Sequence, residues 1–139
     1  MAGYSGTPLI KKLGIKEGFR VALINAPDGF EHELGSIPAG AAVVWPSKRP
    51  LDLILAFVRT EAGLKKSFSA LARKLTPAGM LWIAWPKKSA GVATDLSFAV
   101  VQETGLASGL VDTKICAVNE VWSGLRFVIR VRDRRQIRS

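Results

Sequence analysis

One stretch of the chain is apolar at nearly every position, and it limits the folds that are open to the rest. Residues 51–58 read LDLILAFV, and Asp52 is the only charged side chain among them. A strand with one solvated face alternates apolar and polar residues, whereas a strand inside a parallel sheet is covered on both faces. The run is also too short to cross a bilayer as a helix. The pattern therefore predicts a buried parallel strand, and with it a protein of the α/β class.

Strand and helix patterns alternate on both sides of this run. Two closing apolar runs, separated by a short turn at 119–124, predict an antiparallel hairpin. Another turn is expected at 76–79 (TPAG), and Thr94 and Gly105 are expected to begin and end the last helix. The order predicts an open, doubly wound, mostly parallel sheet with a C-terminal antiparallel hairpin strand, in a single domain over residues 1–139. The strands are predicted over 19–25, 42–45, 51–58, 80–85, 110–118 and 125–132, and the helices over 9–13, 64–75 and 95–104.

The chain is strongly basic, with a formal net charge of +9 and a sequence pI of about 10.2. A basic surface attracts anionic partners and also keeps a protein soluble by self-repulsion, so charge alone leaves both explanations open. No apolar run is long enough for a membrane helix, and residues 1–7 lack the regions of a signal peptide. The single cysteine, Cys116, suits a reducing compartment. We therefore expect a cytoplasmic protein without membrane contact.

Two segments of the chain resemble a known fold. RPLDLILAFV (49–58) and LTPAGMLWIAWPK (75–87), with a helix between them, resemble the second half of a class I methyltransferase, which is a Rossmann-like fold. In that fold a strand of the fDlvl type leads to a helix and then to L-x-P-G-G-x-l. The resemblance implies that the last, antiparallel strand lies between two parallel neighbours. The chain is also similar to a bacterial family, domain of unknown function three thousand and fifty-two, in LGIKEG (13–18), LWIAWPKKSAG (81–91) and the turn WSG (122–124).

The methyl-donor site of this fold has two sequence marks that the chain lacks. The class places a glycine-rich loop after the first strand and an acid at the end of the second. Here the first loop, NAPDGF (25–30), has one glycine, and Pro27 removes a backbone donor. The second strand ends in VVWPS (43–47), which has no acid. We therefore expect no cofactor and, in particular, no binding of S-adenosylmethionine.

Other chemistry finds little support in the sequence, which assigns no catalytic residue and leaves open whether the protein is an enzyme. The chain has no phosphate-binding loop of the G-x-x-x-x-G-K-[ST] type, no G-x-G-x-x-G fingerprint and no G-x-S-x-G elbow. A structural metal site needs about four ligands at defined spacing, whereas His32 stands alone between two glutamates. That segment is typical of a solvated helix face. Cys116, in the middle of a predicted strand, is expected to be a small buried apolar residue.

The loops that follow the parallel strands hold the least ordinary polar and aromatic residues of the chain. In an open α/β sheet, ligands bind outside the carboxyl ends of the strands, where the strand order reverses. We expect these loops to surround one concavity that holds a small anion or a protein partner, with Lys87 or Lys88 near a helix start at Asp95. Trp122 either covers the ligand or packs on Trp85. The candidate residues of this rim are Asn25, Asp28, Lys87, Lys88, Ser89, Thr94, Asn119, Glu120 and Trp122.

The last strand alternates apolar residues (Leu125, Phe127, Ile129, Val131) with mostly basic ones, which predicts one buried and one solvated face. The residues beyond it, 133–139, are expected to form a frayed basic tail. Clustered arginines contact phosphates in nucleic acids, and they also keep an edge strand soluble. The main expectation is a methyltransferase-like domain that binds an anion or a protein partner. The alternatives are an S-adenosylmethionine-dependent methyltransferase and a nucleic-acid-binding module that uses Arg126, Arg130, Arg132, Arg134 and Arg135.

Overall fold

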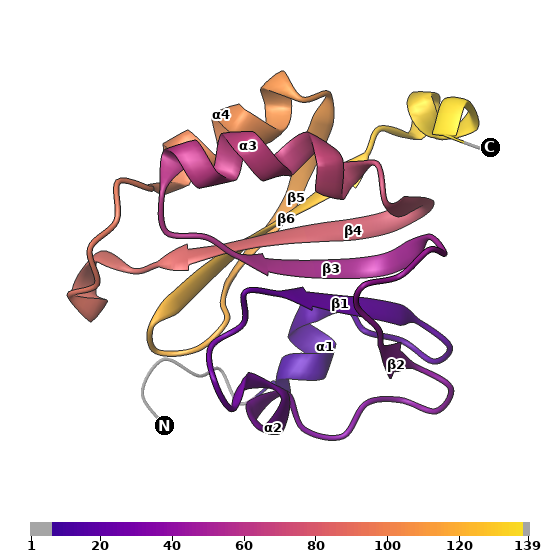
Figure 1. Cartoon of the computed structure of the whole chain (residues 1–139), viewed down its shortest axis with the longest axis horizontal. Helices are drawn as coiled ribbons and strands as arrows, with labels where there is room; N and C mark the ends of the chain where they lie inside the picture. The colour runs from indigo at the N-terminus through magenta and orange to yellow at the C-terminus, as the bar shows by residue number, and fades with distance from the viewer. Residues whose placement is uncertain (1–6, 138–139) are drawn as a thin grey trace.

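The computed structural model describes residues 7–137, in which six strands form one sheet (Figure 1). The strand order is β2-β1-β3-β4-β6-β5, and neighbours among the first four strands are parallel. Strand β6 runs antiparallel to both of its neighbours, so the last strand lies between two strands of the opposite direction. This confirms the predicted sheet. The strands are β1 (Arg20–Ile24), β2 (Ala42–Val43), β3 (Leu51–Phe57), β4 (Leu75–Pro86), β5 (Leu110–Ala117) and β6 (Trp122–Ile129).

Strand β3 is the buried parallel strand that the apolar run predicts. It pairs with β1 on one side and β4 on the other, and all of its residues except Asp52 are buried. Asp52 is half-buried, and its carboxylate accepts the backbone N–H of Arg20 at 2.8 Å. The one charged residue of the run is therefore bound to the neighbouring strand at the amino edge of the sheet, and it costs the core little.

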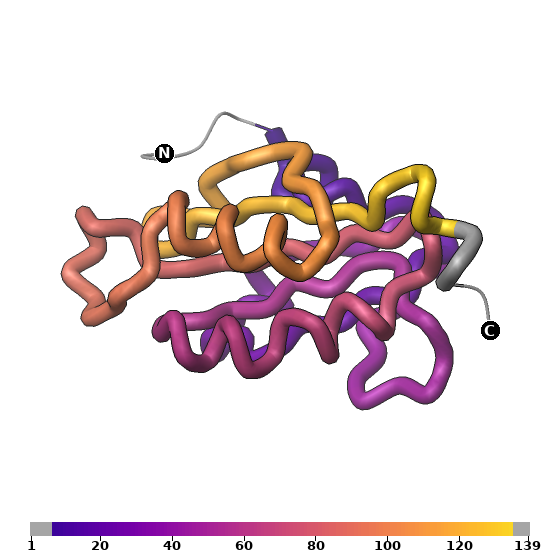
Figure 2. Tube along the Cα trace, turned by 90° about the horizontal axis from the view of Figure 1, so that it is seen from above, coloured from indigo at the N-terminus to yellow at the C-terminus, as the bar shows by residue number. Residues whose placement is uncertain are grey.

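Helices cover both faces of the sheet (Figures 1 and 2). The longer helices, α3 (Glu61–Ala72) and α4 (Phe98–Ala107), pack with Trp85 in one core cluster. The short helices, α1 (Leu9–Leu13) and α2 (Phe30–Leu34), pack with Trp82 in a second cluster on the other face. Helix α3 begins at Thr60, whose hydroxyl accepts the N–H of Gly63 at 3.0 Å. Two 3₁₀-helices complete the elements, η1 (Lys88–Ala90) and η2 (Val131–Ile137).

The turn predicted at 76–79 is wrong, because these residues belong to β4. Leu51 pairs with Leu75 and Leu53 pairs with Met80, so the segment between them forms a bulge in the strand. The backbone carbonyl of Leu51 lies 3.0 Å from where a Cβ of Gly79 would stand. A proline and a glycine here therefore mark a bulge at the beginning of a strand, where a glycine admits a close backbone approach.

The predicted limits of the last helix are also wrong. Helix α4 begins after Ser97, whose hydroxyl accepts the N–H of Val100 at 3.3 Å, and it continues past Gly105 to Ala107. Gly105 is buried against the ring of Phe127, which leaves no room for a side chain. This glycine is thus required by packing between a helix and a strand, and it does not end the helix.

The closing hairpin is tighter than predicted. The side-chain oxygen of Asn119 accepts the N–H groups of Val121 and Trp122, each at 2.9 Å, so the turn closes early. Residues 122–124 therefore begin β6 and do not form the turn that the sequence pattern indicated. Leu125, Phe127 and Ile129 are buried as predicted, but Val131 lies in η2 and is 75% exposed. The segment expected as a basic tail falls in η2 up to residue 137, and residues 138 and 139 lie outside the described residues.

No helix within residues 7–137 has both the length and the apolar character needed to cross a membrane.

Candidate functional site

The parallel strands bring their carboxyl ends to one edge of the sheet, at the left in Figure 1. Ile24 pairs with Ala56, and Phe57 pairs with Ala84, so the loops that follow β1, β3 and β4 begin side by side. The start of β6 lies at the same edge, because Trp122 pairs with Pro86. This is the edge at which the sequence places its candidate residues, and we call it the carboxyl edge.

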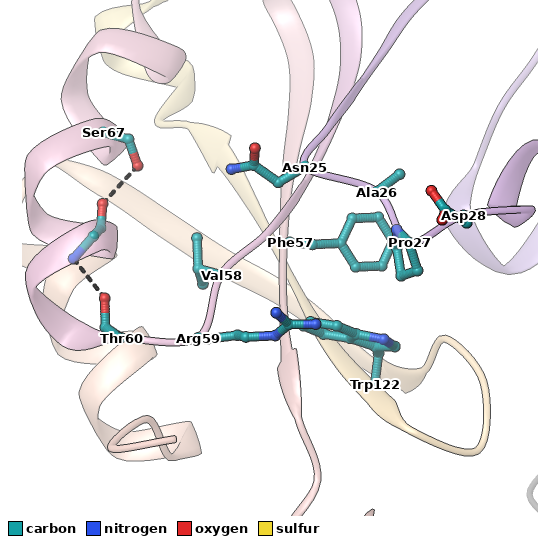
Figure 3. Close-up of a pocket in the computed structure, with 11 residues that line it drawn as sticks. Asn25, Ala26, Pro27, Asp28, Phe57, Val58, Arg59, Thr60, Ser67 and Trp122 are labelled. Atoms are coloured by element: carbon teal, nitrogen blue, oxygen red, sulfur yellow. Dashed lines mark hydrogen bonds between the residues drawn. The ribbon is translucent and has the colours of Figure 1, made fainter. Parts of the chain in front are cut away.

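A cavity of about 700 Å³ opens at this edge between the loops that follow β1 and β3. These two strands are neighbours, while β2 lies on the outer side of β1, so the order of strands reverses at this point. Ligands of open α/β sheets bind at such a reversal. We call it the first cavity; it is lined by Asn25, Ala26, Pro27, Asp28, Phe57, Val58, Arg59, Thr60, Gly63, Ser67 and Trp122 (Figure 3).

A second cavity of about 720 Å³ lies on the other side of the loop that follows β1. Residues 25–28 line both cavities and form the wall between them. The opposite wall of the second cavity comes from Leu23, Val43 and Trp45, and Trp45 is 43% exposed. The two cavities therefore lie next to each other along the carboxyl ends of β2, β1 and β3.

The loop between the two cavities makes sharp turns with a single glycine. Asn25 has a φ of 56° and Gly29 a φ of 80°, so both lie in the left-handed region. Asparagine tolerates this region better than most residues. The carbonyl of Pro27 accepts the N–H of Phe30 at 3.1 Å, which starts α2. The single glycine of this loop is one reason why no cofactor is expected from the sequence. In the structure Asn25 adopts a conformation that usually requires glycine.

Aromatic rings form the floor of the first cavity. Phe57 contacts Trp122 edge to face, with ring centroids 5.0 Å apart, and contacts Phe30 at the same distance. The guanidinium of Arg59 lies over Trp122, 5.6 Å from the ring centroid (Figure 3). Trp122 is 4% exposed and belongs to the opposite core cluster from Trp85, so the expected contact between these two tryptophans does not occur.

Three polar side chains at the first cavity remain available to a ligand. Thr60 caps α3, and the hydroxyl of Ser67 donates to the carbonyl of Gly63 at 2.9 Å, so both hydroxyls serve the helix (Figure 3). The side chains of Asn25, Asp28 and Arg59 have no hydrogen-bond or ion-pair partner within residues 7–137, and all three are exposed. The first cavity thus presents one carboxylate, one guanidinium and one amide above an aromatic floor.

Of the predicted rim residues, Asn25, Asp28 and Trp122 line the first cavity, and the rest line neither cavity. Lys87, Lys88 and Ser89 lie at η1, beyond the end of β4. Asn119 holds the hairpin turn, and its amide donates to Glu33 at 2.8 Å. Glu120 is exposed at that turn.

Thr94 and Asp95 have a different role from the one expected. The hydroxyl of Thr94 donates to the carbonyl of Arg59 at 2.7 Å, and the carboxylate of Asp95 accepts the N–H of Glu61 at 2.8 Å. Both residues therefore fix the loop after β3 and the start of α3, and no helix begins at Asp95. The expected anion site at that helix start is missing, and the lysines stand apart from the first cavity.

Arg59 lines the first cavity but is not among the candidate rim residues, although the sequence places it in one of the loops at this edge. It directly follows the buried strand β3 and its half-buried neighbour Val58. The order of elements could have indicated this residue, because Arg59 lies in the loop after the strand that pairs with β1.

The arginines of the nucleic-acid alternative are partly engaged within the fold. The Nε–H of Arg126 donates to Thr113 at 2.9 Å, and its guanidinium lies 5.8 Å from the centroid of Trp82. Arg134 donates to the carbonyl of Ile129 at 3.1 Å, and Arg132 lies 3.8 Å from the carboxylate of Asp133. Arg130 is half-buried, and the side chain of Arg135 lies outside the described residues. The nucleic-acid reading stays a prediction.

His32 and Cys116, considered for metal and thiol chemistry, line neither of the two cavities. His32 is exposed on α2 between Glu31 and Glu33. Within residues 7–137 no three His, Cys, Asp or Glu side chains gather as metal ligands would. Cys116 is half-buried on β5, and burial raises the pKa of its thiol. A raised pKa keeps the thiol protonated and unreactive near neutral pH.

Several solved structures with a similar fold are methyltransferases by name. A SAM-dependent methyltransferase from Aquifex aeolicus matches with a TM-score of 0.55 and 15% identity, over 86% of each chain. A magnesium protoporphyrin IX methyltransferase from Synechocystis PCC 6803 with bound SAM matches with a TM-score of 0.55 and 9% identity, over 87% of this chain and 74% of that one. Fibrillarin from Aeropyrum pernix with natively bound S-adenosyl-L-methionine matches with a TM-score of 0.52 and 15% identity, over 91% of this chain and 70% of that one.

This chain has the class I methyltransferase fold. The identities are low, so the likeness shows the fold alone. No family model matches the chain, and no curated protein matches it either. The likeness to the bacterial domain of unknown function therefore stays a prediction.

The expectation of no cofactor is corrected by the same comparison. Two of these similar structures carry bound S-adenosylmethionine. This contradicts the expectation, based on the missing glycines, that no cofactor is bound. The physical reason is the loop at 25–28, because Asn25 gives it a left-handed turn without the glycine-rich sequence.

Proposed function

We propose that the protein binds S-adenosylmethionine in the two cavities beside residues 25–28 and is an S-adenosylmethionine-dependent methyltransferase. The observation that carries the proposal is the first cavity, where Asp28 and Arg59 stand unpaired at the reversal of strand order above the ring of Trp122. The fold and the bound cofactor of its structural neighbours support this function better than a domain that binds no methyl donor.

The charges of the first cavity fit the amino-acid end of the cofactor. That end carries an ammonium and a carboxylate close together. Asp28 is an acceptor for the ammonium, and the fork of Arg59 matches a carboxylate with two parallel hydrogen bonds. A single cation would suit any small anion, whereas a cation and an anion at one cavity suit a zwitterion.

The second cavity fits the nucleoside end. Leu23, Val43 and the exposed ring of Trp45 offer an apolar wall to a planar base. Asp28 and Glu31 at the same cavity offer carboxylate oxygens to ribose hydroxyls. An acid is therefore present, but it comes from the loop after β1 and the start of α2, where the sequence analysis did not look for it.

The bound cofactor supplies an electrophilic methyl group on a sulfonium. The protein's own task is to hold and orient the reactants, since correct positioning alone lowers the barrier of a transfer between two bound molecules. Arg59 lies against Trp122, and its carbonyl is bound by Thr94, so the loop that carries it is held in place. The floor of Phe30, Phe57 and Trp122 excludes water from below.

Several narrower predictions remain beside this proposal. A small anion or a protein partner at the carboxyl edge, a cytoplasmic location and kinship with the bacterial domain of unknown function rest on the sequence alone.

The proposal is tested by calorimetric titration with S-adenosylmethionine and with its demethylated product. We expect saturable binding in the micromolar range, weakened at least about tenfold by Asp28→Ala, because a hydrogen bond to a charged group contributes about 1.5–3 kcal/mol. Glu17→Ala is the matched control, since it also removes an exposed carboxylate but lies outside both cavities. No saturable binding, or an equal loss in both variants, would refute the proposed site.

A further inference from the structure

A third cavity, of about 180 Å³, lies at the opposite edge of the sheet. The connection between β2 and β3 projects from the fold beside the end of α3, as Figure 2 shows. The cavity lies between that connection and the residues that follow α3. It is lined by Ser47, Lys48, Arg49, Pro50, Arg73 and Lys74.

The charged side chains that line this cavity are all positive. Four of the lining residues are cations, and Arg20 reaches the same place, where its guanidinium donates to the hydroxyl of Ser47 at 2.6 Å. Within residues 7–137 none of these five side chains has an ion-pair partner. The nearby carboxylate of Asp52, which accepts the N–H of Arg20 and the hydroxyl of Thr76, balances only one of the five positive charges. Like charges this close repel one another, and an anion between them would relieve the repulsion.

Both walls of the cavity are held by hydrogen bonds. The hydroxyl of Ser47 donates to the carbonyl of Arg49 at 3.1 Å and accepts its N–H at 3.2 Å, which folds the connection into a turn. On the other wall, the carbonyl of Lys74 accepts the N–H of Leu51 at 2.8 Å. The Nε–H of Arg20 is buried and has no partner among the described residues. The cations are thus brought together by an ordered backbone.

Helix electrostatics explain only part of this cluster. Arg73 and Lys74 follow the last turn of α3, where cations interact favourably with the helix dipole. Lys48 and Arg49 come from a connection between strands, and Arg20 begins β1, so the dipole does not account for them. The convergence of three separate segments indicates a ligand.

We propose that this cavity binds a phosphate group. A phosphate carries the negative charge that balances the site, and arginine forks and lysine ammonium groups are the groups that commonly hold one. The volume is below the roughly 300 Å³ at which pockets for drug-sized ligands begin, and it suits a single anionic group. The group comes either from a free phosphate compound or from the backbone of a nucleic acid strand. The third cavity shares no lining residue with the proposed methyl-donor site, although Trp45 of the second cavity lies beside Lys74, and the proposal does not depend on that site.

Trp45 gives the site an optical reporter. The ammonium of Lys74 lies 5.6 Å from the centroid of the Trp45 ring, and Trp45 is 43% exposed. The other three tryptophans are buried, with at most 5% exposure. An anion that draws Lys74 into the cavity is therefore expected to change the fluorescence of Trp45, and Trp45→Phe is expected to remove that change.

The first experiment titrates the protein with inorganic phosphate and with pyrophosphate at constant ionic strength, followed by fluorescence. We expect saturable binding that Lys48→Ala/Arg49→Ala weakens at least about tenfold, since both lost cations face the ligand. Lys16→Ala/Lys66→Ala is the charge-matched control, because it removes two exposed cations elsewhere, and its affinity is expected within about twofold of the parent. No saturable binding, or an equal loss in the control, would overturn the proposal.

A second pair of substitutions and a second ligand sharpen the test. Arg73→Ala/Lys74→Ala removes the cations of the other wall and is expected to weaken pyrophosphate binding by a similar factor. Calorimetry measures the affinity, and circular dichroism checks that the variant is folded. A single-stranded oligonucleotide of about ten nucleotides separates the two sources of the phosphate. Binding much tighter than that of pyrophosphate, and lost in the same variants, identifies a nucleic acid strand. Equal or weaker binding identifies a free phosphate compound, and binding that neither pair affects contradicts the proposal.

Discussion

The two edges of the sheet differ in how their charges are balanced. At the carboxyl edge, Asp28 and Arg59 offer opposite charges above the buried ring of Trp122. At the amino edge, the cluster around Lys48 and Arg73 offers one sign of charge, and its cavity has no aromatic lining. A mixed site over an apolar floor selects a ligand by shape and charge together, whereas a cluster of cations selects mainly by charge.

The two edges also differ in how much of the core depends on them. Phe57 and Trp122 belong to a core cluster that includes Leu53 and Trp82, so the floor of the first cavity is part of the fold. The residues that line the third cavity are exposed or half-buried. Changes at the carboxyl edge are therefore expected to alter stability as well as binding, and changes at the amino edge are expected to alter binding alone.

The largest effect on stability is expected from Phe57→Ala. Phe57 is 3% exposed and contacts the rings of Phe30 and Trp122, so its removal leaves a cavity under the site. We expect a loss of about 3–5 kcal/mol in the free energy of unfolding, measured by urea denaturation. Phe98→Ala is the control, because Phe98 is 41% exposed and much less is lost with it. Equal losses in the two variants would show that the floor is not packed as described.

A smaller effect is expected from Thr60→Ala at the wall of the same cavity. The Thr60 hydroxyl accepts the N–H of Gly63 at 3.0 Å and caps α3, so the variant leaves that N–H without its partner. We expect a loss of about 1 kcal/mol, measured by urea denaturation, and a much smaller one for Thr60→Ser, which keeps the hydroxyl. If both variants lose the same free energy of unfolding, then the methyl group of Thr60, and not its capping hydroxyl, supports this wall.

The parts of the fold that the sequence predicts well are those that local pattern determines. Strand β3 is apolar on both faces, and residues 125–129 of β6 alternate between buried and half-buried, so both strands are visible within a few residues. Gly105 looks like a helix end in the sequence. It is a glycine because the ring of Phe127, on a strand distant in the sequence, leaves no room for a side chain. The bulge at 76–79 likewise depends on β3, and no local pattern distinguishes it from a turn.

The sequence predicts the edge at which the first cavity lies, but only some of the residues that line the cavity. The order of elements puts the loops at one edge, and Asn25, Asp28 and Trp122 follow from it. Lys87 and Lys88 follow β4 and are therefore predicted at the rim, yet neither of them lines the first cavity. The cofactor was excluded on a residue type, whereas the loop depends on a backbone conformation that Asn25 also adopts.

The smallest effect on stability is expected at the amino edge, from Lys48→Ala/Arg49→Ala without ligand. Both side chains are exposed and lack ion-pair partners within residues 7–137, so no attraction is lost and some repulsion from Arg20, Arg73 and Lys74 is relieved. We expect the free energy of unfolding to stay within about 0.5 kcal/mol of the parent. Any gain should be larger at low salt, because added ions screen repulsion between exposed charges. Urea denaturation at two salt concentrations measures both quantities. A clear loss of stability that salt does not change would show that these two residues support the fold, and the contrast between the two edges would then fail.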